Sequence, residues 1–322
     1  MLIRMVCPAP PGSLYGNRVT AERWARILRS LGHGVAIAPG YEEGQCDALV
    51  ALHARRSAEA VIRFRRRFPE APLIVALTGT DLYRDIRRSR RAQGALETAD
   101  RIVALQPLAA DELEPHLRRK LRVIYQSAAP TPGRVRRSRE FFDVCVAGHL
   151  RAVKDPFRAA LAARTLPPNS RIRVLHAGGA IDPAMALRAR AEETRNARYH
   201  WIGPLSRART RRLIAQSRIL VLSSRMEGGA NVISEAVVDR TPVLASRIPG
   251  SMGLLGENYP GYFPVGDTGA LARLLVHAES DSSLYRRLQS HTERLAPLFS
   301  PAGERARWKE LLGEIARRQT RK

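Results

Sequence analysis

Short apolar runs alternate with longer amphipathic stretches along the first part of the chain. The runs cover residues 2–6, 34–38, 48–52, 73–77, 101–105 and 121–125. They are almost continuously hydrophobic, which is typical of strands buried on both faces of a parallel sheet. Between the first two runs, residues 20–31 place Trp24, Ile27, Leu28 and Leu31 on one helical face, and Gly32 supplies a stop. This repeat of strand and helix predicts a doubly wound α/β domain.

The same pattern restarts after residue 140. Strands are predicted at 142–147, 171–176, 199–202, 219–223, 242–246 and 262–265, and helices at 207–216, 233–238 and 303–318. The segment 127–139 between the two halves has two prolines, one glycine and a run of charges without apolar periodicity, which is typical of a linker. We therefore predict two domains, residues 1–133 and 134–322, with the last helix packing back on the first domain. Ligands would bind between them, at the carboxyl ends of the strands.

Composition and charge refine this prediction. The 322 residues suffice for about two domains. The net charge is +24, yet Lys120, Lys154, Lys309 and Lys322 are the only lysines, so 54 − 4 = 50 of the cations are arginine. Such a bias indicates a background trait of the whole chain, on which an anion-binding function is superimposed.

Targeting signals and cysteines point to the cytoplasm. No run of about 18 apolar residues occurs, and the N-terminal residues resemble neither a signal peptide nor a transit peptide. Three scattered cysteines, Cys7, Cys46 and Cys145, form no CxxC pair. They indicate a reducing compartment and neither a disulfide framework nor a zinc site.

Residues 219–236 combine a strand, a glycine-containing turn and the start of a helix. Gly228 and Gly229 allow the backbone to approach a ligand closely, and the first N–H groups of the helix would face an anion. Glu227 stands at the end of the strand and Glu235 lies one or two turns into the helix, so that two carboxylates bracket the turn. This arrangement predicts a ligand with the order sugar, diphosphate, sugar.

The block resembles the Glu-x7-Glu motif of glycosyltransferase family 4, the retaining enzymes with the GT-B fold. The resemblance implies that Glu227 contacts the transferred sugar and Glu235 the ribose of the nucleotide. Backbone contacts to the diphosphate and hexose would come from Gly228, Gly229, Ala230, Asn231 and Val232. Residues 148–156 also resemble the family, which implies that Arg151 and Lys154 neutralise the diphosphate.

Further likenesses concern the fold and the nucleobase. The family implies a GT-B architecture of two tandem Rossmann-like domains with an interdomain cleft. Residues 176–179 and 201–205 resemble its loops near the base, which implies backbone contacts at Gly178 and Gly203. The chain has no Asp-x-Asp motif to carry a metal. We therefore expect no cofactor beyond the UDP-sugar co-substrate, with Arg151 and Lys154 in the place of a divalent ion.

The chain also departs from the family pattern, mainly on the acceptor side. Residues 78–81 read Thr-Gly-Thr-Asp where many members have a histidine facing the cleft. Residues 16–17 are Gly-Asn where Gly-Gly is usual, and residues 126–127 are Gln-Ser where Asn-Gly is usual. In the second half Arg240 replaces a glycine, so the helix before it would end without the usual left-handed glycine.

The amino-acid sequences of residues 76–85, 148–158 and 226–236 closely resemble those of one branch of the family, the selenosugar synthases of selenoneine biosynthesis. This implies a UDP-hexose donor, UDP-N-acetylglucosamine or UDP-glucose, selenophosphate as the acceptor, and a 1-seleno sugar as the product. A small anion needs a shell of cations and hydroxyls. The candidates are Asn17, Arg18, His53, Arg55, Arg56, Thr78, Thr80 and His149.

Two other functions stay open. The net charge and the basic run 86–91 would suit a nucleic-acid-binding protein, although only 6% of the residues are aromatic and no binding module is recognised. Alternatively, a helix within residues 54–68 has Val61, Phe64 and Phe68 on one face among arginines. It could associate weakly with an anionic membrane and present a lipid acceptor, or it could be a helix docked on the sheet.

Overall fold

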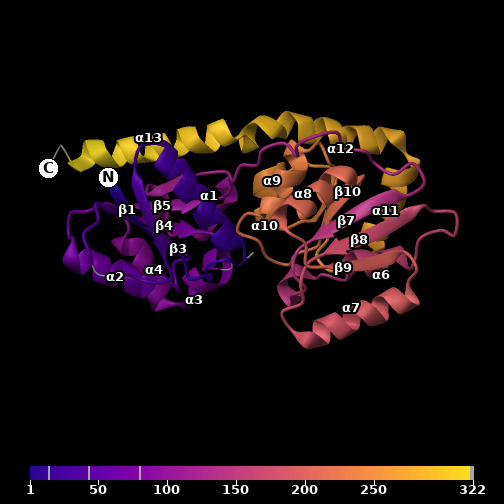
Figure 1. Cartoon of the computed structure of the whole chain (residues 1–322), viewed down its shortest axis with the longest axis horizontal. Coiled ribbons are helices and arrows are strands. Elements are labelled where there is room, and N and C mark those ends of the chain that lie inside the picture. The colour runs from indigo at the N-terminus through magenta and orange to yellow at the C-terminus, as the bar shows by residue number, and fades with distance from the viewer. Residues whose placement is uncertain (14, 43, 80, 320–322) are drawn as a thin grey trace. The chain divides into compact units, whose positions relative to one another are not determined.

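In the computed structural model, whose described residues are 1–13, 15–42, 44–79 and 81–319, the chain divides into two compact units (Figure 1). The first comprises Met1–Gln126, Gly228–Ala230 and Pro301–Lys322. The second comprises Ser127–Glu227 and Asn231–Ser300. Each unit contains one parallel six-stranded sheet.

The sheet of the first unit has the order β2-β1-β3-β4-β5-β6. Its strands are β1 (Leu2–Val6), β2 (Gly34–Ala38), β3 (Ala48–Leu52), β4 (Leu73–Leu77), β5 (Arg101–Ala104) and β6 (Leu121–Val123). Its α-helices are α1 (Gly16–Ser30), α2 (Ala58–Arg67), α3 (Ile86–Arg88), α4 (Arg90–Thr98), α5 (Pro115–Arg118) and α13 (Pro301–Gln319). A π-helical turn, η1 (Asp81–Asp85), precedes α3, and a 3-10 turn, η2 (Pro107–Glu112), precedes α5.

Alternate residues of the central strands enter two apolar clusters on opposite faces of this sheet. One cluster contains Trp24 of α1 and Trp308 of α13, whose rings meet edge to face with centroids 5.0 Å apart. The other contains Val61 and Phe64 of α2. Strands covered on both sides are apolar throughout, which explains why their hydrophobic runs predict them so closely.

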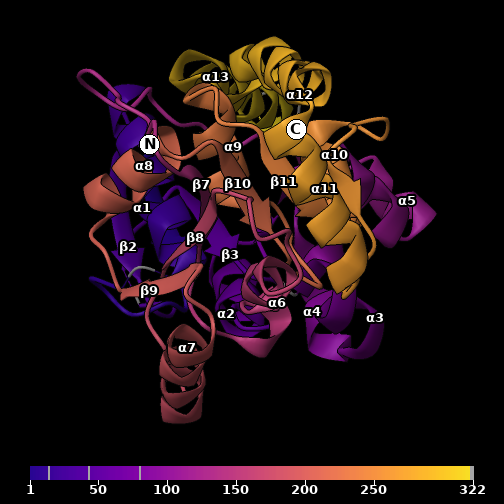
Figure 2. The same ribbon diagram turned by 90° about the vertical axis from the view of Figure 1, so that its right-hand side faces the viewer.

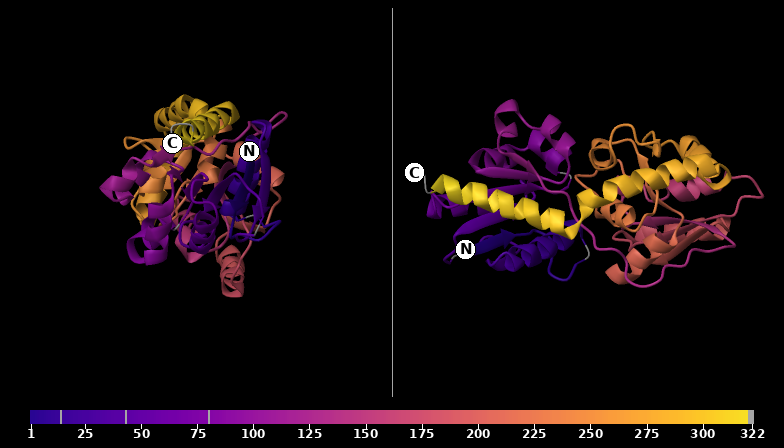
Figure 3. Two further views of the ribbon diagram at one scale, coloured as in Figure 1. Left: turned by 90° about the vertical axis from the view of Figure 1, so that its left-hand side faces the viewer. Right: turned by 90° about the horizontal axis from the view of Figure 1, so that it is seen from above.

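The α13 helix lies on the first unit beside α1 (Figure 3). A buried ionic network accompanies the packing, because Glu304 accepts hydrogen bonds from Arg23 Nε at 3.1 Å and from the Trp24 indole at 2.7 Å. Glu304 is fully buried, so this charge depends on its partners.

The second sheet has the order β12-β11-β10-β7-β8-β9. Its strands are β7 (Phe142–Ala147), β8 (Ile172–Ala177), β9 (Tyr199–Gly203), β10 (Ile219–Leu222), β11 (Val243–Ser246) and β12 (Tyr262–Phe263). The helices are α6 (Arg158–Ala163), α7 (Pro183–Arg195), α8 (Arg207–Gln216), α9 (Asn231–Val238), α10 (Pro249–Leu255), α11 (Thr268–Ser280) and α12 (Ser282–Leu295), with 3-10 turns η3 (Ala152–Lys154) and η4 (Ala296–Phe299). Helices α6 and α11 lie on one face and α8 and α9 on the other (Figure 2).

The sequence-based strand predictions hold throughout. Strands β1–β4 and β7 have the predicted bounds, β8 is shifted by one residue at both ends, and the other strands differ by one or two residues at one end. Helix α1 begins earlier than predicted, at Gly16, and Gly32 after it has the positive φ of a helix stop, 87°. The predicted linker contains no helix or strand in its described residues. It is held to the second unit by Thr131, whose N–H and hydroxyl bond to Asp239 at 2.7 and 2.6 Å.

The helix before Arg240 ends without a glycine, as expected from the departure at this position. Arg240 itself adopts the left-handed conformation, with φ 54°, in the position where a glycine is usual. Thr241 N–H bonds to Ala236 O at 2.8 Å and Arg240 N–H to Val237 O at 3.1 Å, which closes a Schellman motif. The glycine is therefore absent but its conformation is kept.

The membrane-anchor hypothesis for residues 54–68 is not supported. Val61 and Phe64 are fully buried in the core of the first unit, and Phe68 packs against that cluster. The apolar face of α2 is occupied by the sheet, as in the docked-helix alternative. None of the described helices has the length and apolarity needed to cross a membrane.

Candidate functional site

The turns that follow β7, β8 and β9 are joined closely at the carboxyl edge of the second sheet. Gly178 N–H bonds to Gly203 O at 2.8 Å, and the Trp201 indole donates to Gly178 O at 2.8 Å. A Cβ on Gly178 would lie 1.8 Å from Gly148 O, so only glycine fits there. Gly203 has φ 76°, which again favours glycine. The two predicted base-loop glycines thus share one backbone framework.

A buried histidine at the end of β8 contacts the backbone of this framework. His176, at the end of β8, is fully buried, with Nδ1 2.9 Å from the Tyr199 hydroxyl and Nε2 3.2 Å from Gly148 O. Burial lowers the pKa of His176 to about 4, although the bond to Gly148 O opposes the shift. The ring is therefore neutral at pH 7, with Nε2–H donating to the carbonyl and Nδ1 accepting from the hydroxyl.

Lys154 is placed by a short, fixed turn after β7. The turn η3 ends at Lys154, and Asp155 after it has a left-handed φ of 44°. Arg158 Nε donates to Asp155 Oδ2 at 2.8 Å, and the Ser223 hydroxyl donates to Asp155 O at 2.8 Å. Because Ser223 directly follows β10, the turn that carries Lys154 is anchored to the neighbouring strand.

Glu227 and Lys154 form an ion pair at this edge. Lys154 Nζ donates to Glu227 Oε1, and the Ser224 hydroxyl donates to the same oxygen at 2.6 Å. The side chains are 31% and 11% exposed respectively, so the pair is partly shielded from water. A Cβ on Gly250 would lie 1.9 Å from Glu227 O, which requires glycine at the start of α10. In the described part of the chain, Glu227 Oε2 has no hydrogen-bond partner.

Helix α9 begins four residues after Glu227, and Gly228, Gly229 and Ala230 form the connection. Asn231 and Val232 are its first residues, and the N-terminus of a helix favours an anion. Glu235 lies in the second turn, 7% exposed, with Oε1 3.7 Å from an Arg207 guanidinium nitrogen.

The remaining two predicted residues of this edge lie beside the same turn. Arg151 is exposed at the start of η3, and within the described residues its side chain has no ion-pair partner. His149 is half-buried after β7. Among the described residues, the edge therefore offers the Arg151 guanidinium, the Lys154 ammonium, a helix N-terminus and the carboxylates of Glu227 and Glu235. These groups can bind a polyhydroxylated, phosphorylated molecule and stabilise a departing diphosphate.

In the first unit, His53 occupies a buried position between two carboxylates. It follows β3 with a left-handed φ of 73° and is 4% exposed. Its Nδ1 lies 3.9 Å from Asp81 Oδ2, and its Nε2 lies 3.8 Å from Asp85 Oδ2. Burial raises the pKa of the Asp81 carboxyl, and His53 and backbone N–H groups act in the opposite direction. Both ring nitrogens thus face protein groups.

The other acceptor-side candidates differ in exposure. Arg55 is exposed and lies 3.5 Å from Asp85, whereas Thr78, after β4, is 9% exposed. Asn17 and Arg18 are half-buried in the first turn of α1, where Arg18 Nε pairs with Glu22 at 2.6 Å. Thr80 lies outside the described residues.

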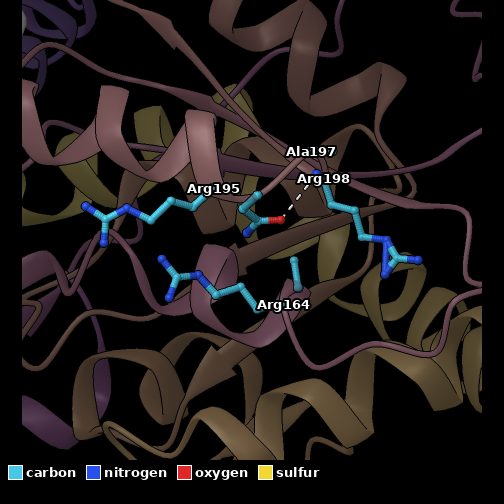
Figure 4. Close-up of a pocket in the computed structure, with 6 residues that line it drawn as sticks. Arg164, Arg195, Ala197 and Arg198 are labelled. Carbon is cyan, nitrogen blue, oxygen red and sulfur yellow. Dashed lines mark hydrogen bonds between the residues drawn. The ribbon is translucent and has the colours of Figure 1, made fainter.

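A separate pocket of about 380 Å³ is lined by arginines (Figure 4). Its lining residues are Ala163, Arg164, Arg195, Asn196, Ala197 and Arg198. Arg164 pairs with Glu192, and Arg198 donates to the carbonyls of Pro167, Pro168 and Ser170 at 2.9–3.2 Å. Ala163 and Arg164 stand at the end of α6, before β8, and residues 195–198 precede β9, so the pocket lies at the opposite end of these strands from the candidate site.

Sequence reasoning missed several supporting residues. Ser224, Gly250 and His176 each act on the backbone or carboxylate of a predicted residue through tertiary contacts. Ser224 lies three residues before Glu227 in the same motif block and His176 begins the motif at 176–179, whereas Gly250 has no local signal. Asp81 lies in the motif at residues 78–81, but the sequence assigns it no role.

Two parallel sheets, each covered by helices on both faces, define an α/β protein of two Rossmann-like domains. Residues 134–294, half of the chain, match the model of the family Glycosyl transferases group 1. The protein belongs to this family. Within the described residues, no three His, Cys, Asp or Glu side chains form a group that could hold a metal ion.

Solved structures with the same architecture are glycosyltransferases of the GT-B fold. HepE from Anabaena in complex with UDP is 16% identical, with a TM-score of 0.76 over 98% of this chain and 100% of that chain. Sucrose-phosphate synthase from Thermosynechococcus elongatus is also 16% identical, with a TM-score of 0.75 over 98% of both chains. A glycosyltransferase from Rickettsia africae is 15% identical, with a TM-score of 0.72 over 98% of both. The GT-B fold predicted from the sequence is confirmed.

Proposed function

We propose that the protein transfers a hexosyl group from UDP-N-acetylglucosamine or UDP-glucose to selenophosphate, as a selenosugar synthase of selenoneine biosynthesis. The observation that carries the donor half is the Lys154–Glu227 pair beside the glycine turn before α9. Family membership supports glycosyl transfer, and HepE has been solved with UDP and with UDP-glucose. The acceptor rests on the resemblance of residues 76–85, 148–158 and 226–236 to that branch.

We assign the donor-side roles from charge and position. Arg151 and Lys154 bind the diphosphate, and the N–H groups of Asn231 and Val232 face it. Negative charge grows on the diphosphate as the glycosidic bond breaks, so groups aimed there stabilise the transition state more than the ground state. Glu227 Oε1 holds Lys154 in place, and Oε2 is available to a sugar hydroxyl.

The reaction balances as a substitution at the anomeric carbon. Selenium donates an electron pair and forms the C–Se bond, while the C1–O bond breaks and its electron pair leaves with UDP. Hydrolysis of the Se–P bond by water then releases phosphate and the 1-seleno sugar. An ionised selenium nucleophile needs positioning more than a general base. From the family-4 resemblance we further propose retention at the anomeric carbon, which proton NMR of the product would test.

We propose that Arg151 and Lys154 take the role of a divalent ion, so that turnover persists in excess EDTA. A loss of activity that Mg²⁺ or Mn²⁺ restores would contradict this. The three cysteines are free and buried, which supports work in a reducing cytoplasm.

The test incubates the protein with UDP-N-acetylglucosamine or UDP-glucose, with and without selenophosphate, and seeks the selenium isotope pattern on the sugar by mass spectrometry. Glu227→Ala and Lys154→Ala should each lower kcat about 10²–10³-fold. Glu257→Ala and Lys309→Ala remove exposed residues of the same types and should leave it unchanged. UDP release without a selenium-bearing sugar would refute the acceptor and leave a glycosyltransferase with another small or lipid acceptor.

A further inference from the structure

One buried carboxylate ties together two turns at the carboxyl edge of the first sheet. Asp81 Oδ2 accepts the N–H of Ala54, in the turn after β3, at 3.0 Å. Its Oδ1 accepts the N–H of Gly79, in the turn after β4, at 2.9 Å. Asp81 is fully buried, and hydrogen bonds to a carboxylate are stronger than those between neutral groups. The relative position of the two turns therefore depends on this side chain.

The two turns carry groups that can donate hydrogen bonds. Arg55 and Arg56 are exposed on the first turn, and Thr78 begins the second. The Thr78 hydroxyl is buried, and it has no partner in the part of the chain that the structure describes. A buried polar group of this kind calls for a ligand or water.

The neighbouring strand adds a second unsatisfied group. Gln106, two residues after β5, is fully buried, and its Nε2 lies 3.0 Å from the Tyr83 hydroxyl. Its Oε1 has no partner among the described residues. Because a tyrosine hydroxyl can donate or accept, the amide can turn and offer its N–H groups instead.

The carboxylates of this edge already have a histidine and arginines beside them. His53 lies between Asp81 and Asp85, while Arg55 and Arg84 lie 3.5 and 3.2 Å from Asp85. A ligand can meet the hydroxyl, the amide, the exposed Arg56 guanidinium and the Arg55 guanidinium, which is 55% exposed beside Asp85. Such a set suits an oxyanion.

We propose that the carboxyl edge of β3, β4 and β5 binds a small tetrahedral oxyanion through Arg55, Arg56, Thr78 and Gln106, and that Asp81 is the positioning residue of this subsite. The proposal rests on the proposed function, because the oxyanion would be the phosphoryl group of the acceptor. It adds Gln106 and Asp81 to the residues expected from the sequence.

The direct test is a calorimetric titration of inorganic thiophosphate into the UDP-saturated protein. Arg55→Gln/Arg56→Gln should weaken binding about tenfold or more, because charge-assisted bonds are lost. Arg66→Gln/Arg67→Gln is the control, since it removes the same charge from exposed positions farther along α2. Thiophosphate binding that is absent in the native protein, or equal in the two double variants, would overturn the subsite.

The positioning role is tested by Asp81→Asn, which keeps the shape but can accept from only one of the two turns. The control is Asp100→Asn, because Asp100 accepts the N–H of Leu73 at 2.9 Å at the other end of β4. Asp81→Asn should raise the KM for selenophosphate about tenfold without changing the KM for the UDP-sugar. Equal effects of the two variants, or a parallel rise in both KM values, would refute it.

The outcomes separate the two proposals. If no selenium-bearing sugar forms but thiophosphate binds and depends on Arg55 and Arg56, the acceptor identity fails and the oxyanion subsite stands. If the selenium-bearing sugar forms and the affinity for thiophosphate is unchanged by these substitutions, the subsite proposal is refuted and the proposed function stands. Should Asp81→Asn fail to fold, Gln106→Leu replaces it and should weaken thiophosphate binding while UDP binding is kept.

Discussion

Replacing Arg240 by glycine should stabilise the second unit. Arg240 is exposed and holds the left-handed conformation that closes the Schellman motif after α9. That conformation costs a non-glycine residue about 1–2 kcal/mol, whereas glycine loses about 0.5–1 kcal/mol more backbone entropy on folding. The net gain is about 0.5–1 kcal/mol. The Arg240 carbonyl, which accepts from Arg137 at 3.1 Å, is retained in the variant.

For a unit of about 170 residues this gain corresponds to a rise in Tm of about 1–4 °C. Hydrogen exchange followed by mass spectrometry should show slower exchange in peptides covering residues 231–246, because the N–H groups of Arg240 and Thr241 close the helix end. Arg240→Ala is the matched control, since it removes the side chain and keeps a Cβ in the left-handed region. If Arg240→Ala stabilises as much as Arg240→Gly, or neither does, backbone strain at this position is refuted.

Two further predictions concern the turns of the donor side. Gly178→Ala should lower the free energy of unfolding by more than about 3 kcal/mol and weaken UDP binding, because its Cβ would overlap Gly148 O. Gly179→Ala should be tolerated, because its Cβ would lie 3.5 Å from the nearest atom. The second prediction concerns pH. The pKa of His176 is about 4 in the folded state and about 6.5 in the unfolded chain, so the unfolded chain binds the proton more tightly. The free energy of unfolding should therefore fall by about 3 kcal/mol as the pH drops from about 6.5 to 4.

Urea unfolding and UDP titration check the glycine pair, and similar losses in Gly178→Ala and Gly179→Ala would contradict the steric argument. The histidine is checked by urea unfolding of the native protein and His176→Gln at pH 7 and 4.5. The variant should be less stable at pH 7 but lose less stability on acidification. Equal losses in both proteins would show that His176 is not the source of the pH dependence.

Much of the fold could be predicted from the sequence because both sheets are parallel and covered on both sides. Strands such as β4, Leu73–Leu77, are then apolar at every position, and the glycine stop at Gly32 ends α1. The donor motif was also visible, since Glu227, the glycines and the start of α9 are contiguous. The sequence could not decide where the apolar face of α2 lies, because an amphipathic helix shows the same pattern whether that face meets a lipid or a sheet.

The candidate site could be predicted only in part. The sequence alone determined the order of elements, the position of the donor block and the scarcity of lysine that made Lys154 prominent. The tertiary structure decided which groups meet: Lys154 with Glu227 across 73 positions, His176 under Gly148, and Asp81 between the turns after β3 and β4. These contacts join strands that are neighbours in a sheet and distant in sequence. Local periodicity reports burial but not partners, so only the folded chain could show them.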